Sequence, residues 1–187
     1  MQKTNIFIIS GPSGAGEDSI INGLEKYFPI RRVVTTTTRD MRQGEKQGSP
    51  YRFISKEEFA KDLKEGKFVE YAEQYNGNFY GVTFDEIVEA KKTEKISIWK
   101  IEYKGVEAAK KIFPEIKSIF VDALSLDVLE KRISRRDNVS VDYINERMNY
   151  TKEWLKHTNI YDFRVINEEG KLNEAIKQVA EIIKNNS

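Results

Sequence analysis

A short stretch near the N-terminus combines residues that bind phosphate. The apolar run Ile6-Phe7-Ile8-Ile9 leads into the loop Gly11-Pro12-Ser13-Gly14-Ala15-Gly16, and a helical pattern follows. Backbone N–H groups in a glycine-rich turn point inward at an anion, and the following helix adds partial positive charge. The spacing of Gly11 and Gly16 fits the phosphate-loop pattern, which continues with Lys and then Ser or Thr. The sequence therefore predicts a phosphate cradle between a strand and a helix.

The centre of this loop departs from the pattern. Glu17 and Asp18 stand where the pattern has lysine and a hydroxyl residue, and the next hydroxyl belongs to Ser19. A like charge about 4 Å from a phosphate costs about 1 kcal/mol in water and about 4 kcal/mol at an effective dielectric constant of 20. One hypothesis is that these three side chains gather magnesium, with Asp18 and Ser19 as ligands. The alternative is that the loop is a nucleotide-phosphate site that has lost its function.

A second polar region spans residues 35–51. It contains the hydroxyl and charged residues Thr35, Thr37, Thr38, Arg39, Arg42, Glu45 and Tyr51. Two arginines three positions apart can hold a phosphate monoester through fork-shaped, charge-assisted hydrogen bonds. From composition alone, a solvated loop with alternating charges is the favoured explanation of the region.

The composition narrows the functional classes. The chain has 187 residues, a net charge of +1, no cysteine and one histidine, His157. One domain with a sizeable core is expected. A disulfide framework and a thiolate metal site are excluded, and a histidine-based zinc site is improbable. The charge balance favours neither nucleic acid nor membrane partners. With no apolar run of membrane-span length and no signal-peptide pattern, a cytoplasmic location is expected.

The order of apolar and amphipathic segments predicts an α/β fold. Extended or strand patterns cover residues 6–9, 31–38, 51–54, 68–72, 96–101, 116–121 and 163–166. Helical patterns cover residues 20–27, 55–66, 85–92, 105–113, 124–136, 141–157 and a C-terminal segment from Leu172. Strands that alternate with helices indicate a doubly wound parallel sheet. A ligand of such a sheet binds at the carboxyl ends of its strands, where the Gly11 loop falls.

Several of these stretches resemble guanylate kinases, in the right order and over nearly the whole chain. They are Thr37-Thr38-Arg39, Arg42, Gly44-Glu45, Gly48, Tyr51, Phe53, Phe68-Val69-Glu70, Gly77 to Gly81, Gly105-Val106, Ser118 to Phe120, Leu129 to Arg132, Arg136, Arg147, Tyr161-Asp162 and Ile166-Asn167. The resemblance implies a phosphate-loop core of residues 1–34, 84–124 and 158–187. It also implies an inserted GMP-binding domain of residues 35–83 and a helical lid of residues 125–157.

The same resemblance implies a reaction and its residues. Guanylate kinases transfer the γ-phosphoryl group of ATP to GMP, with magnesium. The GMP site would comprise Thr35, Arg39, Arg42, Glu45, Tyr51, Glu70, Tyr80, Thr83 and Glu102. Glu70 would accept hydrogen bonds from the guanine N1 and exocyclic amine. Arg132, Arg136 and Arg147 would close over the transferring phosphates, while the loop residues Gly11, Ser13, Gly14, Ala15, Gly16, Glu17, Asp18 and Ser19, with Asn167, would hold ATP.

Other positions depart from the family pattern. Lys100 stands where guanylate kinases have an acid, Lys104 where they usually have glutamine, and Val82 where a hydroxyl contacts guanine O6. In this fold the strand that leads to Lys100 ends beside the phosphate loop. We therefore expect a charge swap in which Lys100 pairs with Glu17 or supplies the missing cation to the phosphates.

Two function classes remain. The first is a kinase for GMP or dGMP, a monomer or homodimer with small nucleotides as partners. The second is a catalytically impaired binding module that grips GMP or a phosphorylated ligand through the same site. The three lid arginines favour the enzyme, because a binding module has little use for them.

Overall fold

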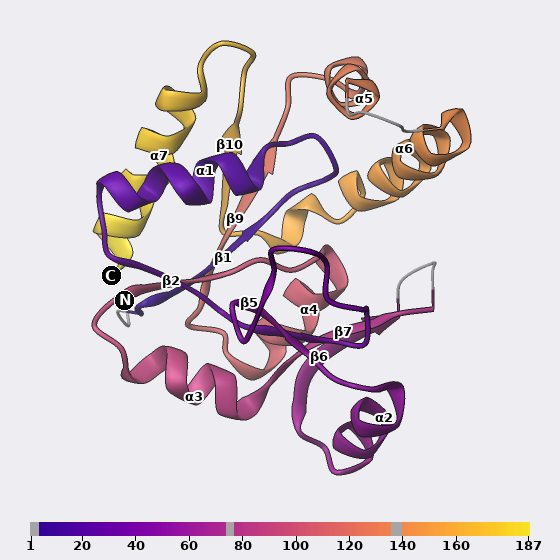
Figure 1. Cartoon of the computed structure of the whole chain (residues 1–187). Helices are drawn as coiled ribbons and strands as arrows, with labels where there is room; N and C mark the ends of the chain where they lie inside the picture. Colours follow the sequence, from indigo (N-terminus) through magenta and orange to yellow (C-terminus); the bar gives the residue numbers. More distant parts are fainter. Residues whose placement is uncertain (1–3, 74–76, 136–139) are drawn as a thin grey trace.

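The computed structural model describes residues 4–73, 77–135 and 140–187. Its central layer is a five-stranded sheet in the order β10-β9-β1-β8-β2, in which every neighbouring pair is parallel. The strands are β1 (Ile6–Ser10), β2 (Ile30–Arg32), β8 (Ile96–Trp99), β9 (Lys117–Asp122) and β10 (Phe163–Ile166). All five residues of β1 are buried, as expected for a central strand covered on both faces. The predicted fold class is confirmed (Figure 1).

Helices cover both faces of this sheet. They are α1 (Glu17–Gly23), α3 (Phe84–Lys92), α4 (Tyr103–Ile112), α5 (Leu126–Ser134), α6 (Val141–Leu155) and α7 (Leu172–Asn186), with short 3-10 turns at Leu24–Lys26 and Thr158–Ile160. Apolar side chains of α1 and α7 pack on one face of the sheet, and those of α3 and α4 pack on the other. No helix in the described part of the chain is long and apolar enough to span a bilayer.

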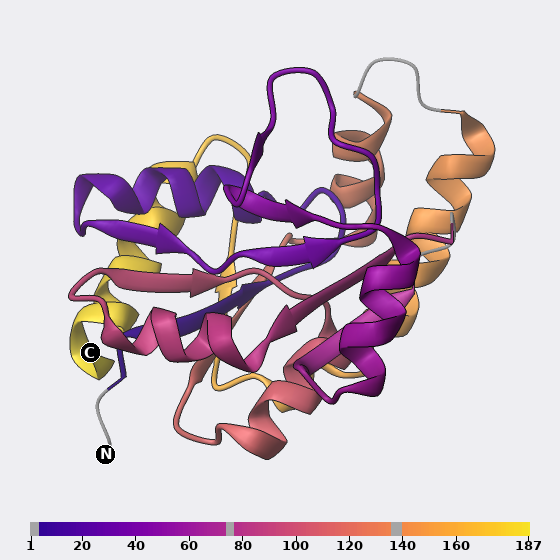
Figure 2. The ribbon, with the colours of Figure 1, turned by 60° about the horizontal axis from the view of Figure 1, so that its bottom comes forward.

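A second sheet in the order β4-β5-β3-β7-β6 adjoins the first (Figure 2). Its strands are β3 (Thr35–Thr37), β4 (Lys46–Gln47), β5 (Pro50–Phe53), β6 (Phe68–Glu73) and β7 (Phe79–Thr83). Helix α2 (Lys56–Lys64) packs against it through Phe59, whose ring stacks on Phe68 with centroids 4.3 Å apart. The start of α2 follows the sequence expectation, because the Ser55 hydroxyl accepts a hydrogen bond from the Glu58 N–H.

Two boundaries differ from the sequence prediction in ways that matter for the site. The helix after the phosphate loop begins at Glu17 rather than at residue 20, so both loop acids lie in its first turn. Strand β8 ends at Trp99, where its pairing with Ile8 of β1 ends. Lys100 and Ile101 therefore leave the sheet at its carboxyl edge. Arg136, at the expected end of α5, lies outside the described residues.

Candidate active site

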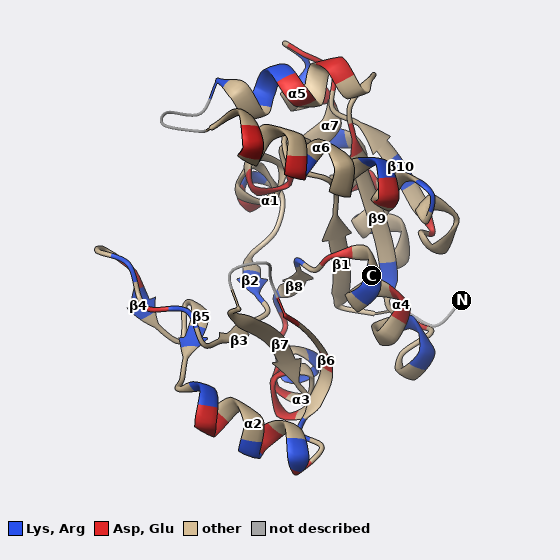
Figure 3. Cartoon of the chain, turned by 90° about the vertical axis from the view of Figure 1, so that its right-hand side faces the viewer, with Lys and Arg blue, Asp and Glu red and all other residues tan. Residues whose placement is uncertain are grey.

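A cavity of about 650 Å³ opens at the carboxyl edge of the core sheet. Its lining residues come from the phosphate loop, the second sheet and helix α6. Figure 3 shows how the ribbons of these elements are arranged. The residues that line it include Gly11, Ser13, Glu17 and Asp18 of the loop and α1, Lys100, Glu102 and Lys104 beyond β8, Thr35, Arg42, Tyr51, Glu70 and Tyr80 of the second sheet, and Arg147, Tyr150 and Trp154 of α6. Residues from four separate parts of the sequence thus share one cleft.

The backbone of the phosphate loop requires its glycines. Gly14 and Gly16 have φ values of +89° and +92°, a region that L side chains rarely adopt. A Cβ on Gly11 would lie 2.3 Å from the carbonyl oxygen of Val121, so this position needs glycine for space. The loop has the strand–turn–helix context that the phosphate-loop pattern demands.

Asn167 and Arg132 brace this loop from behind. The buried Asn167 amide donates a 2.8 Å hydrogen bond to the Ala15 carbonyl oxygen. The Arg132 guanidinium donates to the carbonyl oxygens of Gly14, at 3.2 Å, and of Asn167, at 2.8 Å. Both side chains therefore tie the loop to the end of β10 and to α5.

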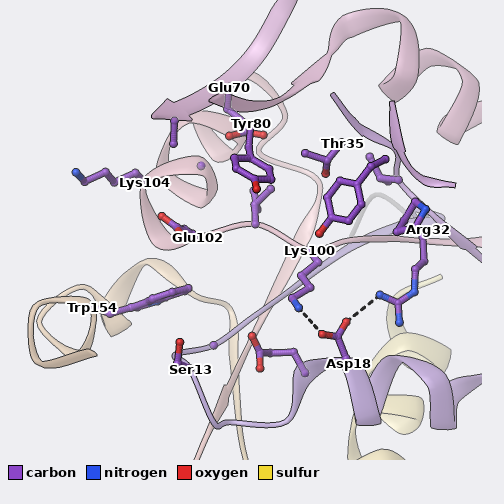
Figure 4. A pocket seen from close by; sticks show the side chains of 18 of the residues that line it. Ser13, Asp18, Arg32, Thr35, Glu70, Tyr80, Lys100, Glu102, Lys104 and Trp154 are labelled. Carbon is purple, nitrogen blue, oxygen red and sulfur yellow. Dashed lines mark hydrogen bonds and ion pairs between the residues drawn. The ribbon is translucent and has the colours of Figure 1, made fainter. Parts of the chain in front are cut away.

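The loop acids form an ion-pair network that corrects one expectation. Lys100 Nζ lies 2.6 Å from one carboxylate oxygen of Asp18, and Arg32 lies 3.0 Å from the other. The hydrogen-bonded partner of Lys100 is thus Asp18, not Glu17 (Figure 4). Burial raises the pKa of Glu17, and the positive charge of Lys100 only partly opposes this shift. The more exposed carboxylate of Asp18 is the better ionic partner.

The pKa of Asp18 shifts in the opposite direction. Partial burial alone would raise it, but hydrogen bonds and charge attraction from Lys100 and Arg32 outweigh burial and lower the pKa below its usual value. Asp18 therefore stays ionised between two cations. Arg32 was not among the residues that the sequence singled out, because nothing local distinguishes it from its neighbour Arg31.

The polar region around residues 35–51 forms a cluster at the edge of the cleft. The Arg39 guanidinium makes two 2.8 Å hydrogen bonds to the Glu45 carboxylate, and its carbon lies 5.3 Å from the centre of the Tyr51 ring. Glu45 also accepts a 2.7 Å hydrogen bond from the Arg42 N–H. The pKa of Glu45 is lowered to about 2, chiefly by the hydrogen bond from Arg39. The Tyr51 and Tyr80 rings meet edge to face, with centroids 6.3 Å apart.

Two carboxylates face each other farther along the cleft. Burial, together with the smaller effect of the negative charge on Glu102, raises the pKa of Glu70 to about 8. Glu102 accepts a 2.5 Å hydrogen bond from the hydroxyl of Tyr150 on α6. An acceptor pair of this kind suits a base edge that presents neighbouring N–H donors. The sequence analysis did not single out Tyr150. Its only signal there is that it follows Arg147 by three residues, which places both on the same face of a helix.

Comparison with known proteins agrees with this geometry. The sequence model of the family described as guanylate kinase matches residues 3–186. The chain belongs to the guanylate kinase family. A guanylate kinase of Mannheimia succiniciproducens is 37% identical over 173 residues, which cover 90% of this chain and 83% of the relative. One of Shouchella clausii is 35% identical over 183 residues, 97% of this chain and 88% of the relative.

A solved guanylate kinase structure has the same fold. The crystal structure of guanylate kinase from Anaplasma phagocytophilum superposes with a TM-score of 0.72 at 25% identity, covering 98% of this chain and 86% of that chain.

Among the other residues implied by the guanylate kinase resemblance, some lie in the cleft and some do not. Arg147 lines the cleft, with its guanidinium 5.2 Å from the centre of the Tyr143 ring. The Thr83 hydroxyl accepts a hydrogen bond from the Glu86 N–H and caps α3. Val82 is fully buried in the core. The expected lid residue Arg136 lies outside the described residues.

The fit of this site to magnesium differs from the sequence hypothesis. Both oxygens of the Asp18 carboxylate are already held by cations, and Ser19 is an exposed residue of α1. In the described part of the chain, no group of three or more acidic or histidine side chains could hold a metal ion. The magnesium ligand set of Asp18 and Ser19 therefore stays a prediction from the sequence, which the two ion pairs of Asp18 oppose.

Proposed function

We propose that this member of the guanylate kinase family transfers the γ-phosphoryl group of ATP to GMP or dGMP. The products are ADP and the corresponding nucleoside diphosphate. The observation that carries the proposal is the single cleft that brings the phosphate loop, the arginine–tyrosine cluster and the Glu70–Glu102 pair together. Phosphoryl transfer requires mainly positioning of two nucleotides and positive charge around the transferring group.

The acceptor nucleotide occupies the second sheet and its loops. Thr35, Arg42, Tyr51 and Tyr80 line the cleft and are suited to contact the phosphate. The guanidinium of Arg39 is hydrogen-bonded to Glu45. When Arg39 gives up or shares this carboxylate, it becomes the second guanidinium, after that of Arg42, to bind the phosphate. Residues 35–83 thus act as the GMP-binding domain. Thr83 is the last residue of this domain.

The base is selected by the carboxylate pair. Ionised Glu70 accepts from the N1–H and exocyclic amine of guanine, and Glu102 lies close enough to share this task. Adenine lacks these donors in that arrangement, so AMP cannot pair with the ionised carboxylate of Glu70. Unpaired buried polar groups are costly, which makes this discrimination strong.

The donor nucleotide occupies the phosphate loop of the core, formed by residues 1–34, 84–124 and 158–187. Magnesium bound together with ATP would supply further positive charge to the phosphates. Lys100 supplies a fixed cation where the loop has Glu17. Arg147 and Arg136, from the proposed lid of residues 125–157, add positive charge around the phosphates as the lid closes and excludes water. Arg132 joins them only by leaving the loop carbonyl oxygens to which it is bonded.

A coupled assay with ATP, magnesium and a panel of monophosphates tests the proposal. We expect GDP or dGDP formation from GMP or dGMP, with little turnover of AMP. Equal turnover of AMP would contradict the base assignment. GMP binding without phosphoryl transfer at saturating ATP would instead indicate the binding module.

A further inference from the structure

Two cations converge on one carboxylate at the centre of the cleft. Lys100 reaches Asp18 from beyond β8, and Arg32 reaches it from the end of β2. Strands β2 and β8 are parallel neighbours, and Arg32 lies in register with Ile98. The two cations therefore leave adjacent strands at the same edge of the sheet and face α1 across the cleft (Figure 4).

In this network two cations surround one anion, the carboxylate of Asp18, in the way that they could surround a bound phosphate. Each oxygen of the Asp18 carboxylate accepts from a different cation, and a second guanidinium nitrogen of Arg32 donates to the Asn22 side chain at 2.7 Å. All three charged side chains are partly open to solvent, with Asp18 60% exposed. Exposed ion pairs contribute little to stability, so this network can open at little cost.

We propose that Arg32 and Lys100 form a clamp for the triphosphate tail, and that Asp18 occupies this clamp only while the cleft is empty. The inference rests on the proposed function, since it concerns the donor side of the same cleft. It assigns a phosphate-binding role to Arg32 and makes Asp18 a competing anion rather than a metal ligand. Phosphate oxygens replace the carboxylate because they accept fork-shaped, charge-assisted bonds from both cations.

The local charge balance explains why such a clamp suits this chain. Glu17 and Asp18 place two acids beside the loop, and Lys100 and Arg32 place two cations opposite them. With Asp18 bound to the cations, its carboxylate partly neutralises their positive charge in the empty cleft. When Asp18 turns into solvent, both cations face the incoming anion, which compensates for the lysine that the loop lacks.

Titration calorimetry with inorganic tripolyphosphate, at pH 8 without metal, tests the clamp on the full chain. Arg32→Gln and Lys100→Gln should each weaken binding about 10-fold, the effect of losing a hydrogen bond to a charged group. Asp18→Asn should tighten it about 5-fold, because a competing charge is removed. The control Arg52→Gln removes the same charge from a surface pair with Glu58, and should change binding less than about 2-fold.

The variants are compared only after thermal unfolding shows that they are folded, and Arg32→Lys serves as a conservative alternative that should retain part of the affinity. The clamp is overturned if Asp18→Asn weakens binding, if Arg32→Gln behaves like Arg52→Gln, or if the unmodified protein does not bind tripolyphosphate. If the expected pattern appears without GDP formation in the coupled assay, the clamp stands and the proposed kinase activity fails. If GDP forms but the variants do not show the expected pattern of tripolyphosphate binding, the clamp is wrong and the proposed kinase activity stands.

Discussion

The hydroxyl of Tyr150 donates a 2.5 Å hydrogen bond to the carboxylate of Glu102. This contact joins α6, beside the cleft, to the loop that follows β8. Burial raises the pKa of the Tyr150 hydroxyl, and the charge of Glu102 adds to the shift, so the hydroxyl remains a donor. The contact fixes one carboxylate of the base-binding pair from the helix that carries Arg147.

Tyr150→Phe removes this donor and keeps the ring. We expect the KM for GMP to rise about 10-fold, since a hydrogen bond to a charged group is worth about 1.5–3 kcal/mol. The KM for ATP should change much less, because the contact is on the acceptor side. Steady-state kinetics with each nucleotide varied in turn measures both values.

The matched control is Tyr71→Phe, on the strand that carries Glu70 but with a side chain that is half exposed. It should leave both KM values unchanged. If Tyr150→Phe also leaves the KM for GMP unchanged, Tyr150 does not position Glu102.

The pKa of Glu70 makes GMP binding depend on pH. Only the ionised carboxylate accepts from both guanine donors, and in the empty cleft its pKa is about 8. The affinity for GMP should therefore rise several-fold from pH 7 to pH 9. Titration calorimetry over this range measures the change, well above the second phosphate pKa of about 6.

Glu70→Gln provides the control for this pH dependence. It should bind GMP weakly, with an affinity that is flat between pH 7 and pH 9. An unmodified protein with an equally flat profile would show that Glu70 is ionised before GMP binds.

The same carboxylate should lower stability at high pH. Its pKa is about 8 in the folded chain, against 4.5 for the unperturbed group, so the folded state binds the proton more tightly. The stabilisation from this proton is fully present below pH 4.5 and is lost as the pH rises through 8. At about 1.4 kcal/mol per pKa unit, the loss is at most about 5 kcal/mol.

Glu70→Gln removes the titrating group and should therefore unfold at a higher temperature than the unmodified protein at pH 9. Near pH 5 the two proteins should differ little. Calorimetric melting curves at both pH values test this, and a constant difference between the proteins would contradict the assignment.

Much of the fold could be predicted because its signals are local. The apolar strand at residues 6–10, the capping hydroxyl of Ser55 and the alternation of strands with helices all follow from short-range patterns. The end of β8 could not be located, because Ile101 is as apolar as the strand before it. That boundary is set by where the pairing with β1 stops.

The site was predictable in its residue types but not in all of its pairs. The sequence predicted that Lys100 lies near the loop, yet its partner depends on which of two adjacent acids has its carboxylate within reach of the ammonium group. Arg31 and Arg32 are indistinguishable by sequence, but Arg31 forms a pair with Glu86 whereas Arg32 lines the cleft. Such choices are made by contacts between segments far apart in the chain, which local patterns do not encode.

The bond between Asn167 and the phosphate loop supports a last prediction. The buried Asn167 amide donates to the Ala15 carbonyl oxygen at 2.8 Å, and a Cβ on Gly16 would lie 2.5 Å from the same amide nitrogen. Asn167→Ala leaves the loop carbonyl without this donor and should cost about 1–3 kcal/mol. For a chain of this size that corresponds to a fall in Tm of roughly 2–12 °C. The exposed control Asn173→Ala, on α7, should lie within about 0.5 kcal/mol of the unmodified protein. If Asn167→Ala weakened ATP binding without lowering the Tm, Asn167 would be a nucleotide contact rather than a brace for the loop.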